Sequence, residues 1–249
     1  RKIKPEEIAV FYQPIVDLVT GRIRGMEALV RWQHPQHGIL APDSFLEGMD
    51  AQEMDVLTDR VMNIAVDNLV TFHGKGFPVA ISINMTASNL IDLGVPDRLH
   101  DLCKVKNIPN EKITIEVTEG EAMRDVRRIM DVLTRLRLRG FGVAIDDFGT
   151  GYSSLRELQR MPFSSMKMDK SFVMDMADNR DSQMIVNTII DLGHNLNLKV
   201  VAEGVETPAV WNMLKDRGCD LGQGYLISKP IPFEKFLAWI TENTGVFKV

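Results

Sequence analysis

The sequence predicts an α/β fold: a TIM-like (β/α)8 barrel with one antiparallel strand that comes from an N-terminal hairpin. Apolar runs that suit buried strands alternate with segments of helical period along most of the chain. No Pro-, Gly- or Ser-rich linker interrupts this alternation, so the 249 residues indicate a single domain. Near the start, two strand-like segments flank a Thr20-Gly21 turn, and this hairpin adds the antiparallel element.

The first half of the chain is expected to form the hairpin and the first strand–helix units. We expect strands at Ile8–Val16, Ile23–Val30, Val79–Ile83 and Ile113–Val117, with helices at Met54–Thr71 and Val95–Val105. Apolar residues at helical spacing support the first helix, and Gly74 and Gly76 follow it as stop signals. Pro96 suits the first turn of the second helix, where a missing N–H costs nothing.

The second half continues the alternation to the end. We expect helices at Glu121–Arg139, Ser153–Arg160, Arg180–Asn197, Pro208–Arg217 and Pro232–Glu242, separated by strands at Val143–Ile145, Ser165–Met168, Lys199–Ala202 and Cys219–Leu221. Gly140 would close the first of these helices, and Ser153 and Ser154 offer N-caps to the second. No GxGxxG motif follows a strand, which counts against an open dinucleotide-binding sheet.

Composition and charge exclude several classes of function. A formal net charge of −5, with no basic run longer than Arg127-Arg128, argues against binding to nucleic-acid polymers. No apolar stretch suits a membrane crossing and no signal peptide is recognisable, so we expect a cytoplasmic domain without membrane contact of its own. Cys103 and Cys219 are too few for a disulfide framework and are expected to be buried. The histidines show no zinc-ligand spacing.

Polar side chains gather where the predicted strands end. They are Glu27 (within the second strand), Asn84, Glu116, Asp146, Asp147, Lys167, Asp169, Glu203, Glu206 and Gln223. In a barrel these ends open on one mouth, where active sites lie. An isolated Asp-Asp pair is more often a solvated turn, but several carboxylates at one mouth would repel one another without cations.

The types of these residues indicate the chemistry. Oxygen ligands with an amide favour Mg²⁺ or Mn²⁺, and a pair such as Asp146-Asp147 could bridge two ions, as two-metal phosphoester hydrolases require. A lysine such as Lys167 beside the ions could orient a water and offset charge that develops on phosphorus. A glycosidase with paired carboxylates is the weaker alternative, because it leaves Asn84, Lys167 and the adjacent aspartates unexplained.

Ordered motifs run along nearly the whole chain. They are Tyr12-Gln13-Pro14-Ile15, Glu27-Ala28-Leu29-Val30-Arg31-Trp32 with His34-Pro35, Ile83-Asn84-Met85-Thr86, Glu116-Val117-Thr118-Glu119, Asp146 to Leu155, Lys167-Met168-Asp169, Glu203-Gly204-Val205-Glu206-Thr207, and Gln223-Gly224-Tyr225 to Pro230. This set resembles the EAL domains, the cyclic di-GMP phosphodiesterases. The resemblance implies a TIM-like barrel with one antiparallel strand and two-metal hydrolysis of cyclic di-GMP to linear pGpG, which lowers the second messenger.

The resemblance also implies roles for individual residues. Glu27, Asn84, Glu116 and Asp146 would hold the first metal ion, and Asp146, Asp147 and Glu203 the second. Two Mg²⁺ or Mn²⁺ ions per site are expected, and Ca²⁺ is expected to be inhibitory. Lys167 would position or activate the attacking water. The catalytic residues would be Lys167 together with two ligands of the second metal ion, Glu203 and Asp147. Whether Glu203 also acts as a base stays open.

Further positions match residues around the substrate in the family. Gln13, Leu29, Arg31, Asp169, Glu206 and Gln223 correspond to positions that contact the dinucleotide. Glu119 corresponds to a glutamate that steadies the loop after Asp147. The helix after this Asp-Asp-Phe-Gly-Thr-Gly loop would form a homodimer interface.

The resemblance and the start at Arg1 lead us to expect residues 1–249 to be one EAL-type phosphodiesterase domain excised from a longer multidomain signalling protein. That protein would carry an upstream sensor or GGDEF-type domain and could be tethered to a membrane. Leu46 to Met54 departs from the family pattern, and we expect this segment to lie away from the metal ligands and to affect a surface or regulatory contact. A catalytically silent cyclic di-GMP receptor is the main alternative, although such relatives typically lack metal ligands that this chain retains.

Overall fold

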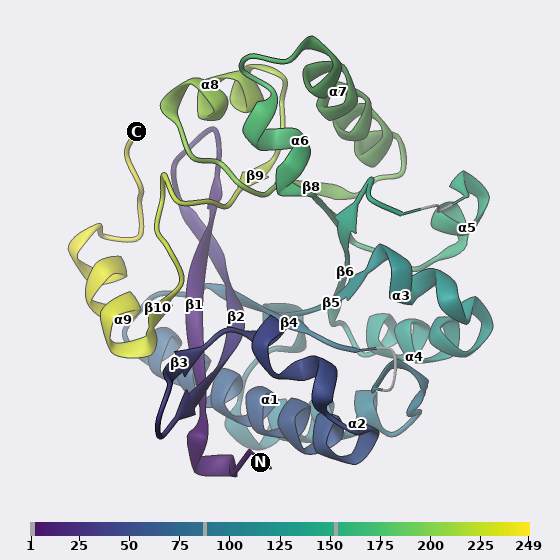
Figure 1. Ribbon diagram of the computed structural model, residues 1–249, viewed down its shortest axis with the longest axis vertical. Helices are drawn as coiled ribbons and strands as arrows, with labels where there is room; N and C mark the ends of the chain where they lie inside the picture. The colour runs from purple at the N-terminus through teal and green to yellow at the C-terminus, as the bar shows by residue number, and fades with distance from the viewer. Residues whose placement is uncertain (1–2, 87–88, 152–153) are drawn as a thin grey trace.

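A closed barrel forms the centre of the computed structural model, which describes residues 3–86, 89–151 and 154–249 (Figure 1). Its strands within these residues are β1 (Ile8–Asp17), β2 (Ile23–His34), β4 (Ala80–Asn84), β5 (Ile113–Thr118), β6 (Gly142–Phe148), β7 (Ser165–Met168), β8 (Lys199–Ala202) and β9 (Leu221–Gly222). β1 runs antiparallel to both β2 and β9 and closes the ring, while the other neighbours pair in parallel. The predicted barrel with one antiparallel strand is confirmed.

Helices cover the outside of the barrel. They are α1 (Ala51–Gly74), α2 (Val95–Lys106), α3 (Glu119–Arg124), α4 (Val126–Leu138), α5 (Leu155–Arg160), α6 (Lys170–Asp175), α7 (Arg180–Asn195), α8 (Pro208–Asp216) and α9 (Phe233–Glu242). Two short strands extend the sheet at its edges: β3 (Gly38–Leu40) pairs with β2, and β10 (Ile231–Pro232) pairs with β1. Figure 1 shows the helices arranged around the ring of strands.

Strand β5 shows how the sequence positions both the core and the site. Ile113, Ile115 and Val117 are fully buried, as expected for a parallel strand that is covered on both faces. Because side chains alternate along a strand, Glu116 points to the opposite side, into the barrel, where it is also buried. A strand that is mostly apolar can therefore deliver one carboxylate to the interior of the barrel.

The predicted helix Glu121–Arg139 is wrong in its boundaries, because the chain forms two helices there. Thr118 caps α3 by accepting a hydrogen bond from the backbone N–H of Glu121. Asp125 leaves helical geometry (φ −142°, ψ 69°) and its carboxylate accepts from the backbone N–H of Arg128, so it caps α4. Asp125 thus separates α3 from α4, and the Thr118 cap lets α3 begin directly after β5.

Smaller differences follow from local capping. Helix α6 was not predicted from the sequence; its N-cap Asp169 accepts a hydrogen bond from the backbone N–H of Ser171. Ser154 caps α5 by accepting from the backbone N–H of Glu157, and the second candidate cap, Ser153, lies outside the described residues.

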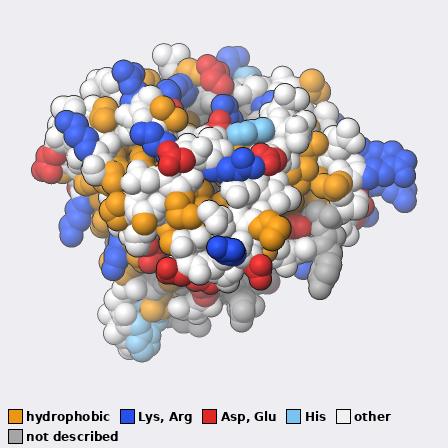
Figure 2. Space-filling view, turned by 90° about the horizontal axis from the view of Figure 1, so that it is seen from above, with side chains coloured by type: hydrophobic (Ala, Val, Ile, Leu, Met, Phe, Trp, Pro, Cys, Tyr) orange, Lys and Arg blue, Asp and Glu red, His pale blue; other side chains and the backbone are white. Residues whose placement is uncertain are grey.

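Other expectations concern the interior and the surface. Cys103 and Cys219 are buried, as predicted. No helix in the described part of the chain has both the length and the apolar character that a membrane crossing needs. On the face drawn in Figure 2, Lys and Arg side chains lie interspersed with Asp and Glu side chains.

Candidate active site

Lys167 lies at the centre of a carboxylate cluster in the barrel. Its side chain, carried by β7, is only 1% exposed. The ammonium Nζ lies 2.8 Å from Glu116 Oε2, 2.8 Å from Glu203 Oε1, 3.2 Å from Asp146 Oδ2 and 3.5 Å from Glu27 Oε2. These partners come from strands β2, β5 and β6 and from the residue after β8, so the closed barrel itself brings distant parts of the sequence together.

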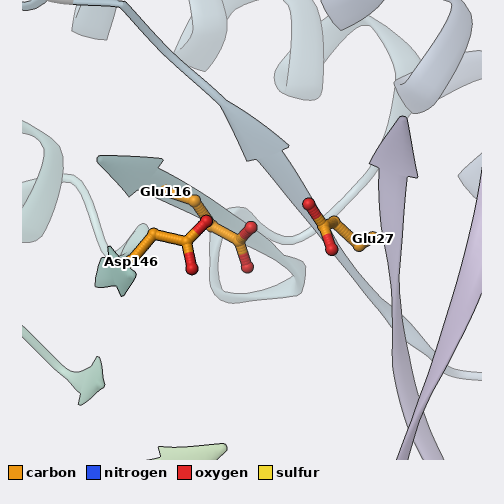
Figure 3. A group of neighbouring side chains, drawn as sticks. All are labelled: Glu27, Glu116 and Asp146. Atoms are coloured by element: carbon orange, nitrogen blue, oxygen red, sulfur yellow. The ribbon is translucent and has the colours of Figure 1, made fainter. Parts of the chain in front are cut away.

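The carboxylates form two groups that share one residue. Oxygens of Glu27, Glu116 and Asp146 lie within 4.8 Å of one another, and so do oxygens of Asp146, Asp147 and Glu203. Figure 3 shows the first group, with the side chains of Glu27 and Glu116 directed toward one another and Asp146 beside Glu116. Each group could hold one cation, and Asp146 could bridge the two.

Burial gives these carboxylates unusual acidities. It raises the pKa of Glu116 well above its ordinary value, and it also raises the pKa of Asp146, despite the nearby Lys167 ammonium. Burial, together with the charges of Asp146 and Glu27, raises the pKa of Glu203 to about 8. The pKa of Asp147 is raised by burial and by the neighbouring Asp146. These carboxylates are short of positive charge.

Lys167 and Glu27, at the centre of the cluster, keep their charged forms favoured in spite of burial. Burial disfavours the charged form of Lys167, but the surrounding carboxylates outweigh it and raise the pKa of the ammonium well above its ordinary value. For Glu27, burial is outweighed by Lys167 and by hydrogen bonds from Gln223 and Asn84, so the pKa of this carboxyl is lowered. One ammonium facing five carboxylates leaves excess negative charge, and this all-oxygen set fits hard divalent cations.

Asp147 owes its position to an irregularity in β6. The pairing of β6 with β7 shifts between Ile145 and Phe148, and Asp147 has a positive φ of 52°. Aspartate tolerates this left-handed conformation better than most residues, and a bulge re-aims the side chains around it. The irregularity lets two consecutive residues, Asp146 and Asp147, both reach the same carboxylate group.

Amide side chains hold Glu27 in place. Asn84 Nδ2 donates to Glu27 Oε1 at 2.8 Å, and Gln223 Nε2 donates to Glu27 Oε2 at 2.7 Å. Gln223 Nε2 also lies 3.0 Å from Gln13 Oε1, and Gln13 Nε2 donates to the carbonyl of Ser228. The predicted site residues from β1, β2, β4 and the segment after β9 are thus linked by hydrogen bonds.

The loop after Asp147 is tied to Glu119. Glu119 is buried at the start of α3, and its Oε2 accepts from the backbone N–H groups of Gly149 (2.9 Å) and Gly151 (3.1 Å). A Cβ on Gly151 would lie 2.9 Å from the Glu119 carboxyl carbon, so glycine permits this close approach. Part of the loop, Tyr152 and Ser153, lies outside the described residues.

The remaining predicted substrate residues lie at different distances from the cluster. Leu29 lines a cavity together with Asp146 and Asp147. Arg31 is half-buried, and its guanidinium lies 5.5 Å from the ring centroid of Phe11. Asp169 is close enough to Asp147 to help raise the pKa of that carboxyl. Glu206 is exposed in the segment between β8 and α8.

The segment Leu46–Met54 lies closer to the site than we expected. Leu46 and Met54 line a cavity of about 540 Å³ that also reaches Asn84, Asp146 and Asp147. The expectation that this segment lies away from the metal ligands is therefore wrong. The other side chains of α1 on this wall are Leu57, Thr58 and Val61, and sequence reasoning missed them because their spacing is that of any core-facing helix.

The chain is similar in sequence to proteins of one known family. The model of the family described as EAL domain matches residues 1–230. Cyclic di-GMP phosphodiesterase NbdA of Pseudomonas aeruginosa is 39% identical over 240 residues, which cover 94% of this chain and 31% of that protein. The bifunctional diguanylate cyclase/cyclic di-GMP phosphodiesterase MucR of the same organism is 37% identical over 244 residues, which cover 95% of this chain and 35% of that protein. The chain spans about a third of the length of these relatives.

The chain is also similar to solved structures of EAL proteins. The structure described as PaMucR Phosphodiesterase, c-di-GMP complex is 36% identical with a TM-score of 0.86, and the match covers 93% of this chain and 94% of that one. The EAL enzyme Bd1971, in its cAMP- and cyclic-di-GMP-bound form, is 34% identical with a TM-score of 0.88, covering 94% of this chain and 65% of that one. On the family match and these identities, the chain belongs to the EAL domain family.

Proposed function

We propose that this domain hydrolyses cyclic di-GMP to linear pGpG with two divalent cations and so lowers the level of the second messenger. The observation that carries the proposal is the pair of carboxylate groups that share Asp146 and surround Lys167. The substrate is supported by relatives that are named cyclic di-GMP phosphodiesterases and by a similar structure in complex with c-di-GMP.

In this proposal the carboxylate groups hold the cations. Glu27, Glu116 and Asp146 would hold the first ion together with Asn84, whose Nδ2 donates to Glu27 and whose Oδ1 could face the ion. Asp146, Asp147 and Glu203 would hold the second ion. Bound Mg²⁺ or Mn²⁺ would supply an activated water and neutralise charge on the phosphate.

Lys167 suits a role between the two groups. Its Nζ contacts Glu116 of the first group and Glu203 of the second, both at 2.8 Å, so its ammonium lies between the two proposed ion sites. From there it could donate to a water or to a phosphate oxygen and offset charge that develops in the transition state. Lys167, Glu203 and Asp147 are the residues that we place in the catalytic group.

The substrate would be held by side chains around the mouth. We assign this role to Gln13, Leu29, Arg31, Asp169, Glu206 and Gln223. An arginine such as Arg31 suits a phosphate or the acceptor edge of guanine, and carboxylates such as Asp169 and Glu206 can accept from guanine N–H groups. Glu119 would keep the glycine loop in the conformation that places Asp147.

The wider setting is also proposed from the family. A homodimer through α5 would use Leu155, whose side chain is 63% exposed at the start of that helix. The loop that Glu119 holds precedes α5 and could link the dimer interface to the metal site. In the whole protein an upstream sensor or GGDEF-type domain would control this cytoplasmic domain, which would bind neither nucleic-acid polymers nor lipid itself.

A turnover assay separates the phosphodiesterase from a silent receptor. Purified protein is incubated with cyclic di-GMP and Mg²⁺, Mn²⁺ or Ca²⁺, and the nucleotides are separated by chromatography. We expect pGpG with Mg²⁺ or Mn²⁺, and binding without turnover with Ca²⁺, which is larger and less strict in its geometry. Tight binding without product under all three cations would identify a receptor instead.

A further inference from the structure

Tyr225 is an exposed aromatic residue in the segment after β9. Its side chain is 56% exposed, whereas the other Phe, Tyr and Trp side chains among the described residues are buried or half-buried. An aromatic ring left in water forgoes the favourable free energy of burial that the other rings gain. Tyr225 contributes little to the core, so its ring is available to a ligand.

The segment that carries Tyr225 is firmly anchored. The backbone N–H of Gln223 donates to the carbonyl of Ala202, and that of Leu226 donates to the carbonyl of Val205. Between them, Gly224 packs so closely on Val205 that a Cβ would lie 2.2 Å from the Val205 carbonyl oxygen. The backbone on both sides of Tyr225 is therefore fixed, and the ring is presented without a further ordering cost.

The neighbours of Tyr225 place it at the edge of the proposed substrate site. Two residues before it, Gln223 donates to Glu27, and the Oε1 atom of Gln223 is buried without a hydrogen-bond partner among the described residues. Burial lowers the pKa of Arg31, and Glu27, Tyr225 and Asp43 lie near enough to act in the opposite direction.

The charges around the ring suit a purine base. Lys229 Nζ lies 5.2 Å from the centroid of the Tyr225 ring, within the range of a cation–π contact. Guanine carries two acceptors, O6 and N7, on one edge, which match cationic side chains such as Arg31 and Lys229. The exposed Tyr225 ring, with Lys229 beside it, could stack on the face of the base while Arg31 and Lys229 contact the edge of the base.

We infer that Tyr225 is a stacking surface for one guanine of cyclic di-GMP and thus a substrate-positioning residue outside the metal cluster. The inference rests on the proposed function, because it takes the substrate from it. Stacking of a base on an aromatic side chain contributes about 1–3 kcal/mol. Since the stack would form equally in the bound substrate and in the transition state, its loss should raise KM and leave kcat unchanged.

The test compares Tyr225→Ala, Tyr225→Phe and wild type in steady-state hydrolysis of cyclic di-GMP with Mn²⁺. We expect Tyr225→Ala to raise KM about tenfold with kcat within about twofold, and Tyr225→Phe to behave as wild type because it keeps the ring. Val105→Ala is a matched control, since Val105 is 81% exposed beside two lysines in the last turn of α2 and should leave both constants unchanged.

Each other outcome has a defined meaning. A Tyr225→Ala enzyme with wild-type KM, or a Tyr225→Phe enzyme as impaired as Tyr225→Ala, would overturn the stacking role while the hydrolysis stands. If wild type binds cyclic di-GMP without cleaving it, the proposed hydrolysis fails, and calorimetric titration then decides the stacking: a tenfold weaker Kd for Tyr225→Ala supports it and an equal Kd overturns it. A wild type that does not bind cyclic di-GMP overturns both.

Discussion

Two groups of charged side chains lie at opposite ends of the barrel: the carboxylate cluster around Lys167 at the mouth, and the Asp220 cluster, in which a single carboxylate is surrounded by hydrogen-bond donors. At the mouth, Lys167 is the shared ion-pair partner of four carboxylates, those of Glu27, Glu116, Asp146 and Glu203, and Asp147 adds a fifth carboxylate beside them. At the other end, where β8 and β9 begin, Asp220 accepts from Lys199 Nζ at 2.7 Å, from the backbone N–H of Val200 at 3.0 Å, and contacts His194 Nε2 at 3.0 Å. One cluster has too few donors for its charge, and the other has a donor for each oxygen.

The carboxyls of the two clusters differ in the direction in which their pKa values are shifted. Burial works against the charge of Asp220, but hydrogen bonds from Lys199 and Val200 outweigh it and lower the pKa of this carboxyl. Burial raises the pKa of Glu116, Asp146 and Glu203 at the mouth, where too little positive charge offsets it. Asp220 is a structural ion pair that is complete in itself, whereas the mouth is an arrangement that added cations would complete.

The largest expected effect comes from removing the shared carboxylate. Asp146→Asn keeps the shape of the side chain but takes a ligand from both proposed ion sites, so turnover of cyclic di-GMP should fall by about a thousandfold or more. Glu27→Ala should abolish turnover as well. The melting temperature of Asp146→Asn without added metal should not fall, because Lys167 keeps Glu116 and Glu203 as partners.

Asp220→Asn is the matched control for Asp146→Asn, because it makes the same chemical change in the Asp220 cluster, away from the mouth. It should leave kcat and KM at wild-type values. If Asp146→Asn retained full turnover, or if Asp220→Asn lost as much as Asp146→Asn, the assignment of the metal site to the mouth would be wrong.

A smaller effect is expected at the loop after Asp147. Glu119→Gln replaces a charged acceptor of two backbone N–H groups by a neutral amide, so the loop should be held less firmly. We expect kcat to fall about tenfold and the free energy of unfolding to fall by about 1–2 kcal/mol. Steady-state kinetics and urea unfolding measure the two effects, with Glu111→Gln, an exposed glutamate before β5, as the control. Wild-type kcat in Glu119→Gln would rule out the proposed role of Glu119.

The smallest expected effect is the contribution of Asp220 to the free energy of unfolding. Because the pKa of Asp220 is lower in the folded chain than the ordinary value of about 3.9, its ionised form stabilises the fold. This stabilisation is fully present above that ordinary value and is lost as the pH falls through the lowered pKa. At pH 7, Asp220→Asn should lower the free energy of unfolding by about 1 kcal/mol, and the difference from wild type should shrink as the pH falls below about 4. A difference that stays constant with pH would show that Asp220 does not act through its charge.

Much of the fold could be predicted from the sequence because its signals are local. The strands Ser165–Met168 and Lys199–Ala202 have the predicted bounds, since apolar runs between turn residues define them. The break at Asp125 and the short helix after Asp169 were missed because each depends on one capping side chain within a polar stretch that also suits a continuous helix or a loop.

The chemical types at the site could also be predicted, but their geometry could not. Strand ends at a barrel mouth indicate which side chains converge, and the structure brings Glu27, Glu116, Asp146, Asp147 and Glu203 together. The sequence does not indicate that Lys167 is fully buried, because a lysine at a strand end is usually exposed. The wall formed by Leu46, Met54 and α1 depends on how the helix packs over the mouth, which no local pattern encodes.

The central claim, that the mouth holds two cations, can be tested most directly by anomalous diffraction from crystals grown with Mn²⁺ and cyclic di-GMP. We expect two anomalous peaks per chain, one among Glu27, Asn84, Glu116 and Asp146 and one among Asp146, Asp147 and Glu203. The absence of peaks at the mouth, or a single peak that avoids Asp146, would contradict it.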